Sequence, residues 1–148
     1  MAFKFRLQSV LDHRAHLEEL ALNAFALKIK AERECQEQIV WLESEHRRAR
    51  AKITDMDVKG MSAAEFQLAN EYATVLRLQA MREQARLPQL QAETHEARLK
   101  LMEARKDRLV LDTLKKRHRK RYDYEQLLAE QRLIDEAAVS GFLRRQTS

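Results

Sequence analysis

The chain has 148 residues, of which 45% are hydrophobic and 34% are charged, with a net charge of +5 and only two glycines and one proline. So few glycines and prolines exclude a sheet protein with many turns, and the abundance of Ala, Leu, Glu, Lys and Arg is typical of long helices and coiled coils. A single cysteine, Cys35, excludes an intramolecular disulfide framework, and no run approaches the roughly 18 consecutive apolar residues of a membrane span. We therefore expect a cytoplasmic, all-α protein.

The first helix is expected over about residues 5–58, where apolar residues such as Leu11, Ile39 and Leu42 recur at helical spacing. The stripe is narrow, which favours a two-stranded coil over a helix buried in a globular core. Its register slips between Phe25 and Ile29, a stutter that predicts local unwinding of the supercoil.

A sharp turn is predicted at 59–62. Gly60 can adopt the left-handed conformation that ends a helix. Ser62 and Glu65 have the S-x-x-E spacing of a capping box, which starts a new helix. We therefore expect one helix to stop and another to begin within a few residues.

The second helix is expected over about residues 63–143, with a bend at Pro88. Pairing back from the turn places Phe3 opposite about residue 118, so the chain after Arg119 overhangs as a single helix. This overhang carries apolar residues as far as Phe142, a pattern typical of a docking surface, although a tail that folds back or self-associates is the alternative. The predicted fold is a single long antiparallel two-helix coiled-coil hairpin over residues 1–148, with helix two longer than helix one.

Catalysis is not expected. A phosphate-binding loop needs several glycines, and a two-helix hairpin offers no enclosed cavity for acid–base chemistry. His13 and His16 have the spacing of half a metal site, but no second cluster completes it, so we expect neither a metal nor a cofactor.

The strongest charge feature is the basic run 115–121, with six positive charges in seven residues. It is either a solvated helical face, a site for a charged protein partner or, with the stacking rings of Tyr122 and Tyr124, a nucleic-acid site. Because aromatic residues on a helix beside such a run more often pack on a partner, we favour the protein partner and expect no nucleic acid.

The two ends of the chain have a more specific pattern. Residues 3–14, FKFRLQSVLDHR, resemble the opening of the flagellar FliJ family, and the segment from Tyr122 through EQRLIDEA to FLRR at 142–145 resembles its close. The resemblance implies a stalk and chaperone component of flagellar type III export, similar to the coiled coil of the rotary ATP synthase gamma subunit. It further implies a protein needed for motility that is peripherally associated with the inner membrane at the flagellar base.

The partners implied by the resemblance are the hexameric export ATPase, the cytoplasmic domain of the export-gate membrane protein and substrate-specific export chaperones. The implied ATPase-binding residues lie at the end with both termini: Lys116, Arg117, Arg119, Lys120, Arg121, Phe142, Arg144 and Arg145. The implied gate-binding residues are Gln38, Leu42, Tyr72 and Leu76, although Glu45 and Ala49 stand where the family has aromatic residues. The alternatives are a generic coiled-coil adaptor, the equivalent stalk of a virulence secretion system or, last, a basic nucleic-acid binder.

Overall fold

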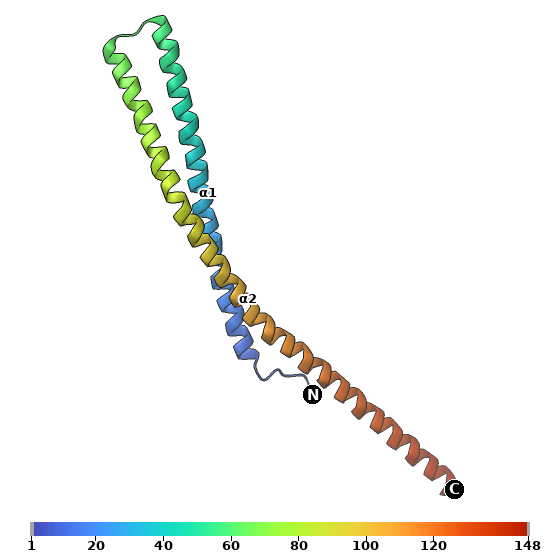
Figure 1. The fold of residues 1–148 in the computed structure, drawn as a ribbon. Helices are drawn as coiled ribbons and strands as arrows, with labels where there is room; N and C mark the ends of the chain where they lie inside the picture. The colour runs from blue at the N-terminus through green and yellow to red at the C-terminus, as the bar shows by residue number, and fades with distance from the viewer. Residues whose placement is uncertain (1, 148) are drawn as a thin grey trace. The chain divides into compact units, whose positions relative to one another are not determined.

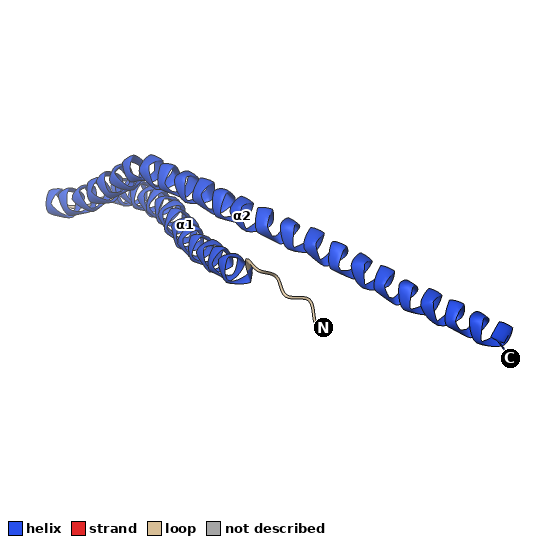
Figure 2. Cartoon of the chain, turned by 90° about the horizontal axis from the view of Figure 1, so that it is seen from below, coloured by secondary structure: helices blue, strands red, loops and turns tan. Residues whose placement is uncertain are grey.

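The structure is a computed structural model that describes residues 2–147. These residues form two helices and no strand: α1 spans Gln8–Lys59 and α2 spans Ala63–Thr147 (Figures 1 and 2). The prediction of an all-α fold with a longer second helix is confirmed, since α2 has 85 residues and α1 has 52. Neither described helix contains a stretch long and apolar enough to cross a bilayer.

The chain divides into two compact units, and both helices contribute to each. The turn unit comprises residues 19–102. The terminal unit comprises the segments up to Glu18 and from Glu103 onward.

The turn unit is a hairpin whose connection was predicted from sequence. Gly60 has a φ of +84°, the left-handed conformation that only glycine adopts without strain, and its N–H donates to the Asp57 carbonyl at 3.3 Å. The Ser62 hydroxyl oxygen accepts the N–H of Glu65 at 3.2 Å, which satisfies one of the unpaired donors of the first turn of α2. A short turn at Gly60 thus connects the end of α1 at Lys59 to the start of α2 at Ala63.

A narrow apolar seam joins α1 to α2 in this unit. Leu42, Leu76 and Ala80 form one buried cluster, and Cys35, Ile39 and Leu90 form another. Residues later in α1 thus meet residues earlier in α2, which defines an antiparallel pair. This seam confirms the expected two-stranded coil.

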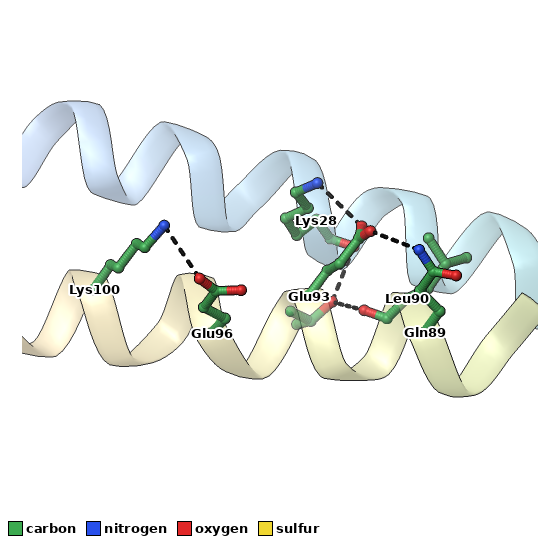
Figure 3. A network of polar contacts seen from close by, with 7 residues as sticks. Lys28, Gln89, Leu90, Glu93, Glu96 and Lys100 are labelled. Atoms are coloured by element: carbon green, nitrogen blue, oxygen red, sulfur yellow. Dashed lines mark hydrogen bonds and ion pairs between the residues drawn. The ribbon is translucent and has the colours of Figure 1, made fainter.

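Polar contacts between the helices flank the seam (Figure 3). Lys28 Nζ lies 3.1 Å from Glu93 Oε2. The hydroxyl of Thr94 lies 2.9 Å from the Leu90 carbonyl on its own helix and 3.3 Å from the Lys28 carbonyl on the other, so the two carbonyls share one donor. The hydrogen bond from Lys28, and then its positive charge, lower the pKa of the Glu93 carboxyl. These contacts hold α1 and α2 in register at the edge of the apolar seam.

Pro88 lies inside α2, which continues through it. Proline removes one backbone donor and its ring crowds the preceding turn. A bend at Pro88 stays a prediction, but the helix does not end there.

In the terminal unit, the start of the chain packs along α2. Phe5, Leu11 and Leu111 form a buried cluster, and further apolar residues pack against it: Phe3, Leu7 and Leu114. The N–H of Gln8 donates to the Phe5 carbonyl at 3.1 Å, which ties the non-helical arm of residues 2–7 to the first turn of α1.

Ion pairs and a hydrogen bond also join α1 to α2 in the terminal unit. The Glu18 carboxylate pairs with Arg108, and Arg105 Nε lies 3.7 Å from its other oxygen. Arg14 donates to the Asp107 carbonyl at 3.0 Å. Since these groups come from both helices, they fix how α1 lies against α2 in this unit.

Candidate protein-docking surface

The basic run 115–121 lies on α2 in the terminal unit, where one side of the helix is already occupied. Leu111, Leu114, His118 and Tyr122 follow one another at spacings of three and four residues, which places them on a single face. This inner face meets the arm of residues 2–7. The arm therefore covers only this inner face of the basic run.

Aromatic contacts fix the arm against this inner face. The rings of Phe3 and Tyr122 have centroids 5.5 Å apart and tilted by 50°, and those of Phe5 and His118 are 5.7 Å apart in an edge-to-face arrangement. The guanidinium of Arg119 lies 5.3 Å from the Phe3 centroid, close enough for a cation–π interaction. The arm thus engages His118, Arg119 and Tyr122. The expectation that Phe3 pairs near residue 118 is met within about one helical turn.

The cations of the run divide into two groups. Lys116 pairs with Asp112 at 3.4 Å, and Arg119 pairs with Asp123 at 3.4 Å, both across one helical turn. In the described part of the chain, the other four cations form no ion pair: Lys115 is half-buried, and Arg117, Lys120 and Arg121 are exposed. Three neighbouring free cations create a local positive potential that attracts an acidic surface.

The last part of α2, which ends at Thr147, extends with no other described segment of this unit beside it (Figure 1). Large apolar side chains on this stretch remain open to solvent, and Leu127, Ile134 and Phe142 are 60%, 67% and 59% exposed. Arg144 and Arg145, the remaining predicted ATPase-binding residues, are exposed in the last turns. All eight predicted ATPase-binding residues therefore belong to one unit.

The four predicted gate-binding residues all belong to the turn unit, where only Leu42 and Leu76 share a buried cluster. Gln38 is exposed and Tyr72 is 53% exposed, whereas Leu42 and Leu76 are 1% and 4% exposed within the seam. In this chain Leu42 and Leu76 therefore hold α1 to α2, and only the other two positions present their side chains to solvent. Their role in gate binding stays a prediction.

An apolar groove near the turn was not found from sequence. It has a volume of about 600 Å³ and opens between the two helices of the turn unit. Its lining is mainly apolar and includes Ala49, Ile53, Met56, Leu68, Tyr72 and Val75. The sequence contains little indication of a groove, because its lining residues recur at the same helical spacing as residues that pack in a closed seam.

Trp41 was also missed by the sequence reasoning. It is 53% exposed on α1, next to Val40, which is 63% exposed. Both fall off the stripe that contains Ile39 and Leu42, and that offset was the available signal. Exposed tryptophan is enriched at protein–protein contacts.

Cys35 is buried within the seam. Its thiol donates to the Glu83 carboxylate at 3.4 Å, and burial, reinforced by that hydrogen bond, raises the pKa of the Cys35 thiol. A neutral buried thiol is a poor nucleophile. No group of three or more His, Cys, Asp or Glu side chains among residues 2–147 is arranged to hold a metal ion.

These observations define the class: a two-helix coiled-coil protein whose exposed faces are suited to docking with other proteins. A family model described as the flagellar FliJ protein matches residues 3–147. The chain therefore belongs to the flagellar FliJ protein family and is a component of the flagellar export apparatus. No match was found among curated proteins or among solved structures.

Proposed function

We propose that this protein is the stalk and chaperone component of flagellar type III export that enters the hexameric export ATPase with its terminal unit and regulates it. The observation that carries the proposal is the end of α2, where unpaired cations are followed directly by exposed apolar residues. Such a helix end, with the family membership, favours a protein-binding role over a purely structural one.

The mechanism follows from the mismatch in symmetry between one helix pair and a ring of six subunits. Each subunit meets different side chains of the terminal unit. A binding partner shifts a conformational equilibrium only through a difference in affinity for the two states, and unequal contacts around the ring supply that difference. The protein itself binds no nucleotide in this proposal.

The turn unit supplies the link to the export gate. Gln38 and Tyr72 are its exposed predicted contacts, and Leu42 and Leu76 support them from within the seam. The proposal also includes escort or recycling of substrate-specific chaperones, peripheral association with the inner membrane at the flagellar base, and no binding of nucleic acid. A coiled coil with exposed apolar residues on both units can engage several partners at once.

The test is the ATP hydrolysis rate of the purified flagellar export ATPase with and without this protein. We expect stimulation by the wild-type chain and its loss when the three exposed, unpaired cations of the run, Arg117, Lys120 and Arg121, are changed to glutamate. The matched control reverses three exposed arginines of the turn unit, Arg33, Arg50 and Arg82, and should stimulate normally. Failure of the wild-type chain to change the rate would remove the proposal, and loss of stimulation in both variants would assign the effect to net charge.

A further inference from the structure

We propose that the end of α2 pairs with the same segment of a second copy of the chain, as an antiparallel two-stranded coil. The pairing surface is the outer face of α2, which consists of the seam positions Tyr124, Leu127, Gln131, Ile134, Ala138 and Gly141. The two halves of this face are complementary to each other in size and in flanking charge. A surface of that kind fits a second copy of itself around a two-fold axis.

The outer face lies opposite the arm of residues 2–7. Its six positions follow one another at spacings of three and four residues, so they share one side of the helix. Tyr124 lies two residues beyond Tyr122, and two residues turn an α-helix by about 200°. Because Tyr122 contacts Phe3 of the arm, the outer face points away from the arm. It therefore stays open to a second copy while the arm is in place.

The outer face has the pattern of a coiled-coil seam. Its alternating spacings of three and four residues continue for about two and a half heptads. Gln131 is the one polar residue among the six positions and lies near the middle. A single polar residue within such a seam specifies how two helices align, at some cost in stability.

The sizes of the side chains select an antiparallel alignment. The first half of the face contains the large residues Tyr124 and Leu127, and the second half contains the small residues Ala138 and Gly141. An antiparallel pair centred on the middle of the face places Tyr124 opposite Gly141 of the second copy. The same centre places Leu127 opposite Ala138. Large residues facing small ones let the two helices interdigitate.

The charges beside the face agree with this alignment. Asp123 of one copy comes within one helical turn of Arg144 of the other, and the two-fold axis repeats this pair. Asp123 already lies 3.4 Å from Arg119 of its own helix, and a carboxylate has room for two such donors. On the other flank, Arg121 comes close to Phe142 of the second copy, where a cation–π contact is favourable.

The carboxylates of this stretch do not meet one another in the pair. Glu125 and Glu136 follow His118 by seven and 18 residues, which returns both to the inner face. Glu130 and Asp135 come level with each other across the pair, but they lie on opposite sides of the seam. The alignment therefore places no carboxylate directly against another.

The basic residues set the limits of the pair and exclude the parallel alternative. A parallel pair would place the run 115–121 against itself along its whole length, and like charges across a helix pair are destabilising. In the antiparallel pair only the ends meet, where Lys120 comes level with Arg145 and solvent screens the repulsion. The coil therefore extends from about Arg121 to Arg144.

Pairing covers Phe142 and Arg144, which are among the predicted ATPase-binding residues. On the proposed function, self-association and ATPase binding therefore compete for the same end of α2. This consequence rests on the proposed function, whereas the pairing itself does not.

The first experiment is analytical ultracentrifugation of the full chain at concentrations up to about 100 µM, which detects association weaker than that of most specific complexes. Ile134→Glu changes the outer face. Leu133→Glu is the matched control, because Leu133 is turned by about 100° from Ile134 and is as exposed, at 66% against 67%. Circular dichroism shows whether each variant is folded.

We expect a dimer from the wild-type chain and an increase in its Kd of more than about tenfold in Ile134→Glu, because the pair would bury two unpaired carboxylates. Leu133→Glu should change the Kd by less than about twofold. A chain that stays monomeric at every concentration overturns the proposal, and equal effects of the two variants overturn the choice of face. Because no ATPase is present, either failure leaves the proposed function untouched.

The second experiment tests the alignment with disulfides between copies. Leu127→Cys and Ala138→Cys are made separately in a Cys35→Ser chain, which removes the natural thiol. Position 127 of one copy lies opposite position 138 of the other, whereas two copies of position 127 are about 16 Å apart along the coil, too far for a disulfide. The same separation applies to position 138.

Under mild oxidation, a mixture of the two variants should therefore form a cross-linked dimer, and neither variant should do so alone. Electrophoresis without reductant shows the product. Cross-linking of each variant with itself would mean a parallel pair and would overturn the antiparallel alignment.

Discussion

The turn unit and the end of α2 are built from the same kind of helix, yet their apolar residues have different fates. Leu42 and Leu76 are almost completely buried, whereas Ile134 and Phe142 are 67% and 59% exposed. Both stretches repeat apolar residues with a helical period. The difference is a neighbouring helix, present in one case and absent in the other. An amphipathic pattern therefore predicts a contact, but it does not say with which molecule.

The largest expected effect on this contrast comes from Leu42→Ala in the turn unit. The leucine is 1% exposed, so its loss should destabilise the protein by about 2–5 kcal/mol in chemical denaturation. Val40→Ala is the control, because Val40 lies two residues before Leu42, on the other side of α1, and is 63% exposed. This change should alter stability by less than about 0.5 kcal/mol. Equal losses would show that the seam is not the source of stability.

The two glycines provide the next test, because one lies in each region. Gly60 has φ +84°, so Gly60→Ala should cost about 1–2 kcal/mol through backbone strain alone, as no atom lies within 4 Å of the added Cβ. Gly141→Ala lies in the open helix end and should raise helicity by circular dichroism, since alanine favours a helix by up to about 1 kcal/mol. If both substitutions changed the stability of the helices in the same direction, the contrast between the turn and the helix end would be contradicted.

A smaller effect is expected where the arm meets α2. A double-mutant cycle between Phe3→Ala and Tyr122→Ala should give a coupling energy of about 0.5–1.5 kcal/mol, because the two rings are in contact. Tyr124, two residues further and on the outer face, should show no coupling with Phe3. Coupling to both tyrosines would mean that the inner and outer faces are not distinct.

The smallest effect concerns the Lys28–Glu93 pair of the turn unit. The pKa of Glu93 is lowered in the folded state, so the pair stabilises the fold above the unfolded carboxyl pKa of about 4.3. That contribution is lost as the pH falls through the folded pKa. Glu93→Gln should therefore be slightly less stable than wild type at pH 7 and equal to it in strong acid. Glu96→Gln, whose partner Lys100 lies on the same helix, is the control. A difference that persists in acid would point to packing instead of charge.

Much of the fold was predictable because its signals are local. Gly60 and Ser62 act through their own backbone and side chain, so the turn needed no tertiary information. The unequal lengths of the helices followed from the position of that turn. The depth of each candidate site residue was not predictable, because exposure depends on the partner helix. Leu42 and Leu76 were expected at a binding face and lie inside the seam.

The sequence by itself determined two long helices, a sharp turn at Gly60 and a helix end rich in basic and apolar residues. These properties depend on residues within a few positions of one another, and composition and spacing record them directly. Only the tertiary structure decided which side of that helix end is free. The arm of residues 2–7 occupies His118 and Tyr122 and engages Arg119, and it leaves Lys120 on the opposite side. That choice depends on contacts between residues more than a hundred positions apart, which no local pattern encodes.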